Sequence, residues 1–376
     1  MQHPYKAQIL DRVRRVVVKV GSSTLSGSSG IKSESIATIA WRLSTLHTTG
    51  KEVVLVTSGA VSAGMSRLGL QGRPKTIPAK QAAAAVGQIA LMALYEEYFS
   101  AHGLHVAQIL LTHDDLGNRK RYLNAKHTMR TLLEAKVIPI VNENDTVAVE
   151  EIQLGDNDNL SAQVAVLIEA DLLVILSDVA GLYDKDPRVH QDATLLPLVH
   201  RFDNALLASG GEAGPLGRGG MASKLQAAHK AALSGIPTII ADGRNENILV
   251  QVFDANIETG TLFLPVADRL ASRKHWIAYT LKPAGALVVD AGARTAILEQ
   301  GRSLLPPGVR AVRGVFEEGE CVACLDDAGR EFARGLVNYS SEAIEHIKGA
   351  RTSQIEQILG YKVSNEVIHR DDLALL

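Results

Sequence analysis

The 376-residue sequence has only two cysteines, few aromatic residues and almost no net charge. Two cysteines exclude a secreted scaffold held by several disulfides, and they favour a reducing, cytoplasmic setting. A formal net charge of −2 gives no broad electrostatic reason to expect nucleic acid or an anionic membrane as the main partner. Residues 1–15 contain no apolar segment of the signal-peptide kind. The longest apolar run, residues 82–94, contains Gln88 and is predicted to be too short to span a membrane.

The two cysteines form one C-x-x-C pair, Cys321 and Cys324, in the run "GECVACLDD". A single pair cannot complete a four-ligand zinc site. The run has the pattern of a strand, in which positions i and i+3 point to opposite faces. We therefore expect ordinary packing for both thiols rather than metal binding or redox chemistry.

Between residues 15 and 265, short β-branched runs alternate with longer segments that suit helices. The runs are apolar throughout, which is typical of strands buried on both faces. They are "RVVVKV", "EVVLV", "HVAQILL", "VIPIV", "DLLVILS" and "IPTIIA". The helical segments are residues 33–47, 79–101, 120–135, 159–169 and 221–234. This alternation predicts an α/β fold, a mostly parallel sheet sandwiched by helices, with ligands beyond the carboxyl ends of the strands.

The pattern changes near residue 268. Short strand-like pieces separated by Gly and Pro turns follow from Gly285 onward, with a helix near residues 340–349. We expect three parts: a catalytic domain at 1–267, a linker at 268–284 and a small β-barrel at 285–376.

Three small-residue loops suit a bound anion. Lys19 lies at the end of the first strand beside Gly21, and Ser58 follows the second strand and opens a helix. A third loop, residues 209–228, carries six glycines before a helix that contains Lys224. Backbone N–H groups and lysines of this kind favour phosphate or carboxylate. Solvated turns, a simple helix cap and a disordered surface loop are the alternatives.

Two neighbouring loops are crowded with acid and amide side chains. Residues 142–145 read Asn-Glu-Asn-Asp after a strand, and residues 156–159 read Asp-Asn-Asp-Asn before a predicted helix. Carboxylates can bind an ammonium group or Mg²⁺, and amides can bind a carboxylate. Turn formation and capping are the alternative roles of such residues.

Taken together, these loops predict phosphoryl transfer from a nucleotide to a small polar acceptor, because that chemistry requires mostly positioning and charge neutralisation. Ser177 and Asp178, at the end of another strand, could contact the nucleotide. A carboxylate acceptor is already ionised at neutral pH, so no general base is required.

Seven motifs resemble, in order, those of the glutamate 5-kinases, a branch of the amino-acid kinase family. They are "VVVKVGSSTL", "VTSGAVSAG", "KQAAAAVGQ", "VNENDTVA", "GDNDNLSA", "LSDVAGLYDKDPR" and "GRGGMASKLQAA". The tail, including "LVVDAGARTAIL" and "ARGLVNYSS", resembles a PUA domain. The resemblance implies phosphorylation of the L-glutamate γ-carboxylate by ATP with Mg²⁺, as the first step of proline biosynthesis. It also implies proline as a feedback inhibitor and a homodimer or homotetramer.

The resemblance also assigns roles to individual residues, none of them as a metal ligand. Lys19 and Lys224 match phosphate-binding lysines, and Asp158 matches the acid that holds them. Glutamate binding falls to Ser58, Asp145, Asn157 and the nearby Asn142. Nucleotide contacts fall to Lys19, Ser177, Asp178, Arg218, Gly219, Gly220, Met221, Ala222, Ser223 and Lys224. Arg218 departs from the family pattern, which has Thr there, so no side-chain contact is carried over at that position.

Two rival interpretations remain at this point. A sister kinase acting on acetylglutamate, aspartate or UMP should lack the paired acid and amide loops and the tail. RNA binding is the second, because PUA domains bind RNA in other proteins. From Gly285 onward, however, ten Lys and Arg residues face fourteen Asp and Glu residues, and RNA binding favours a basic surface.

Overall fold

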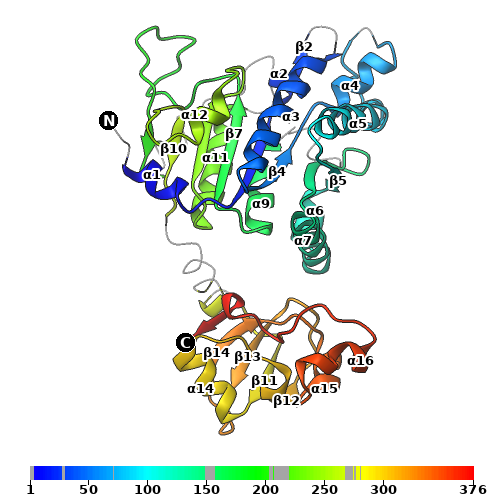
Figure 1. Ribbon diagram of the computed structural model, residues 1–376, viewed down its shortest axis with the longest axis vertical. Coiled ribbons are helices and arrows are strands. Elements are labelled where there is room, and N and C mark those ends of the chain that lie inside the picture. The colour runs from blue at the N-terminus through cyan, green and yellow to red at the C-terminus, as the bar shows by residue number, and fades with distance from the viewer. Residues whose placement is uncertain are drawn as a thin grey trace. The chain divides into compact units, whose positions relative to one another are not determined.

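The computed structural model describes residues 4–27, 30–70, 72–148, 157–202, 206, 220–266, 274, 277–279 and 281–376. The chain divides into two compact units, Met1–Val266 and Ala267–Leu376, and each is described by itself (Figure 1).

The first unit is built on a sheet whose strands run in the order β5-β6-β4-β1-β7-β9-β10-β8. The pairs from β5 to β9 are parallel, and β10 is antiparallel to β9 at one side. The strands are β1 (Arg15–Val20), β4 (Glu52–Val56), β5 (Val106–Leu111), β6 (Ile138–Glu143), β7 (Leu172–Ser177), β8 (Leu198–Val199), β9 (Thr238–Asp242) and β10 (Thr261–Phe263). A two-stranded hairpin, β2 (Ser26–Gly27) with β3 (Gly30–Ile31), lies outside this sheet.

Helices cover both faces of the sheet (Figure 1). They are α1 (Pro4–Leu10), α2 (Ser22–Leu25), α3 (Ser33–Thr48), α4 (Ala60–Arg67), α5 (Ile77–Ser100), α6 (His113–Gly117), α7 (Arg119–Glu134), α9 (Asn157–Leu167), α11 (Met221–Leu233) and α12 (Ile248–Val252). One core cluster joins α3, α5 and α12 to the sheet, and a second joins α7, α9 and α11 to the opposite face.

The alternation of side chains along β1 decides which face Lys19 occupies. Val16, Val18 and Val20 belong to the core under α3 and α5, whereas Val17 belongs to the core under α9 and α11. Because successive residues of a strand point to opposite faces, Lys19 lies on the same face as Val17. The chain therefore directs this lysine toward the helices that carry its partners.

Helices α4 and α5 approach each other closely because two glycines meet at their crossing. A Cβ atom on Gly64 would lie well inside 3.0 Å of the Ala83 carbonyl, and one on Gly87 would meet the Ala60 carbonyl in the same way. Side chains at either position would force the two backbones apart. This crossing fixes the position of α5 relative to the end of β4, from which α4 departs.

The second unit contains a five-stranded sheet in the order β12-β11-β13-β14-β15, with β11 and β13 parallel. Its strands are β11 (Gly285–Val289), β12 (Val309–Arg313), β13 (Cys321–Leu325), β14 (Glu331–Leu336) and β15 (Leu373–Leu375). Its helices are α14 (Ala291–Gln300), α15 (Ser341–Ile347) and α16 (Ile355–Leu359), with short 3-10 turns at Pro306–Gly308, Thr352–Gln354 and Arg370–Asp372. Leu287, Phe316 and Tyr339 lie in its core.

The cysteines pack as predicted. Cys321 and Cys324 form no disulfide and are buried, and they lie in two different apolar clusters, as opposite faces of β13 require. Ile277 and Ala278, which fall within the predicted linker, are buried with Cys321 in the smaller cluster. These two residues therefore pack as part of the second unit.

Two sequence predictions were wrong in detail. Asn157 and Asp158 were placed before a helix, but they are the first two residues of α9. The apolar run around Gln88 was judged too short to span a membrane, yet α5 is 24 residues long and passes that test by length and composition. This test does not distinguish a membrane span from a helix of a protein core, and α5 packs Leu91, Tyr95 and Phe99 into the first core cluster.

Candidate functional site

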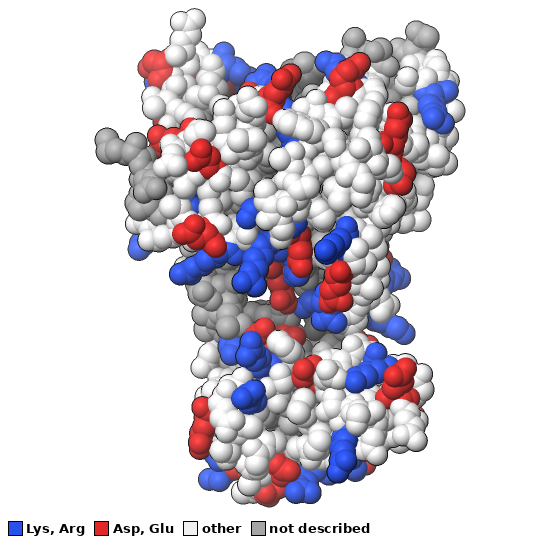
Figure 2. All heavy atoms as spheres, viewed as in Figure 1, with Lys and Arg blue, Asp and Glu red and all other residues white. Residues whose placement is uncertain are grey.

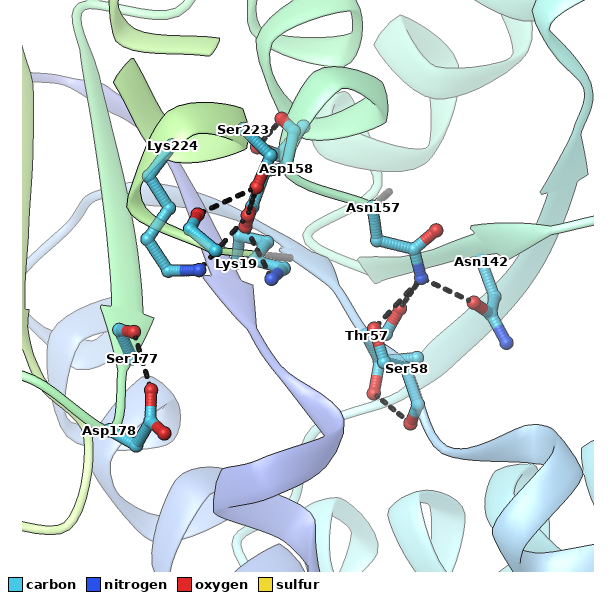
Figure 3. A network of polar contacts seen from close by, with 12 residues as sticks. Lys19, Thr57, Ser58, Asn142, Asn157, Asp158, Ser177, Asp178, Ser223 and Lys224 are labelled. Atoms are coloured by element: carbon cyan, nitrogen blue, oxygen red, sulfur yellow. Dashed lines mark hydrogen bonds and ion pairs between the residues drawn. The ribbon is translucent and has the colours of Figure 1, made fainter. Parts of the chain in front are cut away.

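The predicted site residues meet where the parallel strands of the first unit end. Lys19, Ser58, Asn142 and Ser177 lie at or just beyond the carboxyl ends of β1, β4, β6 and β7. Asn157 and Asp158 begin α9, and Lys224 lies in the first turns of α11 (Figure 3). Carboxyl ends of parallel strands form the usual ligand-binding edge of such sheets.

Lys19, Asp158 and Lys224 form a buried charge cluster. Asp158 is 1% exposed, and the two lysines are 6% and 5% exposed. Lys19 Nζ pairs with Asp158 Oδ1, and Lys224 Nζ lies 3.1 Å from Asp158 Oδ2. The Ser223 hydroxyl donates to the same Oδ2 atom at 2.7 Å. One carboxylate thus fixes the ends of two long side chains that come from different elements.

The electrostatics of this cluster favour an anionic ligand. Burial alone would raise the pKa of Asp158, but the charges of Lys19 and Lys224 and the hydrogen bonds from Lys19 and Ser223 lower it to about 2. Asp158 is therefore ionised at neutral pH. Two ammonium groups against one carboxylate leave a local excess of positive charge in a buried setting, which attracts phosphate oxygens.

A cluster of amide groups lies directly beside the charged residues. Asn157 Nδ2 donates to the Thr57 carbonyl at 2.5 Å, to Ser58 Oγ at 2.9 Å and to Asn142 Oδ1 at 3.0 Å (Figure 3). The sequence suggested that amides here would bind a carboxylate. Since the Asn157 nitrogen is already engaged, the group that Asn157 offers to a ligand is Oδ1, an acceptor.

Donors for a carboxylate come from the turn after β4. Ser58 Oγ accepts the bond from Asn157, so its own O–H can donate to a ligand. Gly59 follows with φ 101° and ψ 3°, a left-handed conformation that favours glycine, and turns the chain into α4. The first N–H groups of α4 have no partner within the helix and point back toward this turn. This arrangement is suited to a carboxylate.

Asp145 is the acid that the sequence analysis assigned to the substrate ammonium group. It lies in the loop that follows β6, three residues beyond Asn142. Burial raises its pKa to about 6. Within the described part of the chain, the Asp145 carboxylate makes no ion pair. A partly buried carboxylate without a cationic partner suits a ligand that brings its own ammonium group.

Ser177 and Asp178 end β7 on the other side of β1. Ser177 is buried and donates from Oγ to Asp178 Oδ1 at 3.1 Å, while Asp178 is exposed. Ser177 is in register with Asp242 of β9, and the Gly243 N–H donates to the Ser177 carbonyl at 2.7 Å. The strand end is therefore held in place by β9 while the Asp178 side chain remains accessible to a ligand.

The glycine-rich loop is described in part. Gly220 is the N-cap residue of α11, and Met221, Ala222, Ser223 and Lys224 form its first turns. The predicted contacts at Arg218 and Gly219 lie outside the described residues.

Sequence reasoning missed the residues of α5 that support the pocket. Gln88 Oε1 accepts a 2.8 Å hydrogen bond from Asn142 Nδ2, and Tyr95 forms a 2.8 Å hydrogen bond with Thr57 Oγ1. Gln88 interrupts an otherwise apolar run, and this was the signal available: a polar side chain at a position expected to be buried needs a partner. The run was considered as a helix, as a possible membrane segment and, within "KQAAAAVGQ", as a family motif, but no role was assigned to Gln88.

Among the residues that the structure describes, no group of three or more His, Cys, Asp or Glu side chains is arranged to hold a metal ion. Asp158, the most buried acid of the site, is already engaged by two lysines.

Two family models and several known proteins match this chain. The model of the amino acid kinase family matches residues 14–242, and the model of the PUA domain matches residues 285–359. A glutamate 5-kinase from Geobacter sulfurreducens is 51% identical over 373 residues, covering 99% of this chain and 100% of that protein. A glutamate 5-kinase from Caldanaerobacter subterraneus is 50% identical over 364 residues, covering 96% of this chain and 98% of that protein. A solved UMP kinase structure from Bacillus anthracis has 16% identity and a TM-score of 0.45, covering 68% of this chain and 97% of that one.

Proposed function

Because the chain belongs to the amino acid kinase family, we propose that it transfers the γ-phosphoryl group of ATP to the γ-carboxylate of L-glutamate. The product is L-glutamyl 5-phosphate, and the reaction is the first step of proline biosynthesis. The observation that carries this proposal is the direct adjacency of Asn157 and Asp158. Asn157 bonds to Ser58, which we assign to glutamate, and the next residue, Asp158, pairs with the two lysines that we assign to phosphate.

The pocket offers complementary groups to each end of a free amino acid. The Asp145 carboxylate and Asn157 Oδ1 are acceptors, and they suit the substrate ammonium group. The Ser58 hydroxyl and the N–H groups at the start of α4 are donors, and they suit a carboxylate. Binding through fixed groups supplies rate by orientation, because the acceptor oxygen is held near the phosphoryl group before reaction.

The lysines provide the charge stabilisation. Lys19 and Lys224 are held by Asp158 at fixed positions, so they neutralise the transferring phosphoryl group without having to reorganise. The acceptor carboxylate of glutamate is ionised at neutral pH, because a glutamate side chain in water has a pKa of about 4.3, so no residue has to remove a proton.

Mg²⁺ is part of the proposal as the metal of the nucleotide. The described residues form no protein cage for a metal, and Mg²⁺ usually binds through substrate phosphates with one or two carboxylates. When bound, it supplies further neutralisation of phosphate charge.

A hydroxamate assay tests the activity. The protein is incubated with ATP, Mg²⁺ and hydroxylamine, and glutamate, aspartate and acetylglutamate are compared, since each acyl phosphate yields a coloured hydroxamate complex. Product from glutamate alone supports the proposal. Preference for aspartate or acetylglutamate would assign the chain to a sister activity, and so would phosphorylation of UMP in a parallel assay.

RNA binding by the second unit is the alternative from another class of protein. On the face drawn in Figure 2, basic and acidic side chains are interspersed over this unit. Such a surface gives weak attraction to a phosphate backbone. We therefore propose an architectural or regulatory role for this unit. Retention of RNA by the protein at physiological salt would contradict it.

Three further expectations remain proposals. Proline should inhibit, because it carries the same α-carboxylate and a cationic amine that the glutamate pocket recognises. The chain should form a dimer or tetramer by analogy with its family, and it should act in the cytoplasm. Inhibition by proline that glutamate relieves, and a mass from light scattering above 40.3 kDa, would support the first two.

A further inference from the structure

We propose that Gln88 is a positioning residue for glutamate: it completes a chain of amide hydrogen bonds, set in direction by the Thr57 carbonyl, that holds Asn142 and Asn157 in one orientation. Gln88, Asn142 and Asn157 are each at least nine-tenths buried. Asn157 Nδ2 donates to Asn142 Oδ1 at 3.0 Å, and Asn142 Nδ2 donates to Gln88 Oε1 at 2.8 Å. The inference rests on the proposed function, because it concerns the same amino-acid pocket.

The direction of this chain of hydrogen bonds follows from one fixed atom. The Thr57 carbonyl can only accept, so Asn157 must turn its nitrogen toward it. Asn142 must then present oxygen to Asn157 and nitrogen to its other side. Gln88 must in turn present oxygen to Asn142. Reversing any one amide would place two donors or two acceptors face to face, so the three amides hold a single orientation together.

The position of Gln88 depends on the close crossing of α4 and α5. Gly87, the preceding residue, allows the two helix backbones to meet, and Gly64 does the same from α4. Both helices are thereby held against the end of β4, where Thr57 and the substrate-facing Ser58 lie. Gln88 therefore reaches Asn142 from a rigid helix rather than from a loop.

Loss of the Gln88 acceptor should change the pocket without touching the lysines. Asn142 Nδ2 would become a buried donor without its partner, which costs free energy. The Asn142 amide would therefore turn so that its nitrogen reaches a different acceptor. The turned amide would present nitrogen to Asn157 Nδ2 and weaken the hold on the Asn157 side chain. The substrate ammonium would then face a poorly oriented Oδ1, while the nucleotide site around Asp158 keeps all its contacts.

The test compares three variants by steady-state kinetics and thermal unfolding. Gln88→Leu removes the acceptor at similar volume. Gln88→Glu keeps an oxygen facing Asn142 whether or not the new carboxyl is protonated. Tyr95→Phe is the control for stability, because it removes a buried hydrogen bond to Thr57 Oγ1 from the same face of α5 and leaves the amide chain intact.

We expect Gln88→Leu to raise the KM for glutamate about tenfold, the effect of one lost oriented hydrogen bond, with the KM for ATP changed by less than about twofold. Gln88→Glu should recover most of the affinity for glutamate. Tyr95→Phe should lower the Tm and leave both KM values near those of the wild type.

Three results would overturn the role of Gln88. The first is an unchanged KM for glutamate in Gln88→Leu. The second is an equal rise in the KM values for glutamate and ATP in that variant. The third is a rise in the KM for glutamate in Tyr95→Phe as large as that in Gln88→Leu. The wild-type protein is assayed first with glutamate. Absence of turnover there would overturn the proposed function itself, so the two failures are distinguishable.

Discussion

Asp158→Asn should destabilise the protein and stop catalysis while increasing its affinity for anions. The substitution keeps the shape of the side chain and removes the counter-charge of two buried lysines. The local charge of the cluster rises from one excess positive charge to two. We therefore expect ATP analogues to bind the variant at least as tightly as the wild type. Turnover should fall by at least about a hundredfold because the ammonium groups are no longer held in place.

The magnitude of the destabilisation can be estimated in two ways. At the 3.1 Å separation of Lys224 Nζ and Asp158 Oδ2, the attraction is about 5 kcal/mol for an effective dielectric constant of about 20, before burial is counted. The pKa of Asp158, lowered from 3.8 to about 2, includes the opposing effect of burial and corresponds to about 2 kcal/mol. We expect a loss of about 3 kcal/mol in the free energy of unfolding, within the range for breaking a buried ion pair.

Urea denaturation followed by circular dichroism measures this loss, with Asp192→Asn as the control. Asp192 pairs with Lys185 on the surface, where an ion pair contributes little. Because the pKa of Asp158 is depressed in the folded state, its contribution is present above pH 3.8 and is lost as the pH falls toward 2. The difference between Asp158→Asn and the wild type should therefore shrink below pH 4. A variant within about 1 kcal/mol of the wild type at pH 7 would refute the inference that Asp158 holds both lysines.

Three other substitutions or conditions test separate parts of the site. Lys224→Ala should abolish turnover and keep the fold, because Asp158 still pairs with Lys19; near-normal turnover would remove Lys224 from the mechanism. The kcat/KM for glutamate should fall as the pH drops below about 6, where Asp145 becomes protonated and loses its attraction for the substrate ammonium; a flat profile between pH 5 and 8 would argue against this role. Gly87→Ala should lower stability by about 1–3 kcal/mol through overpacking at the α4–α5 crossing. Gly72→Ala, where a Cβ meets nothing within 4 Å, should have little effect; equal Tm values for the two variants would contradict the close approach of the helices.

Much of the first unit was predictable because its strands are apolar on both faces. The runs that became β1 and β4 were predicted to the residue, since charged or polar residues mark both ends. The short edge strand β8 and its neighbour β10 were missed. They have two and three residues, and their pairing depends on neighbours distant in the sequence. The sequence pattern of such a short run does not show which distant strand it pairs with.

The predicted phosphate-side residues came together because each lies at a strand end or a helix start, which the topology brings to one edge. The hydrogen-bond directions were beyond sequence reasoning. The amide of Asn157 was expected to bind a carboxylate, and its nitrogen is instead used within the protein. That outcome depends on the Thr57 carbonyl, a backbone atom whose direction no side-chain pattern encodes. Gln88 was overlooked for the same reason, because its partner lies 54 residues away in the sequence.

The succession of Asn157 and Asp158 has a mechanical consequence. Asn157, which we propose contacts the amino acid, and Asp158, which holds both lysines, are joined by one peptide unit in the first turn of α9. A single planar peptide bond cannot lengthen or act as a hinge. The Cα atoms of these two residues therefore stay about 3.8 Å apart. We expect any closing motion during turnover to leave this spacing unchanged.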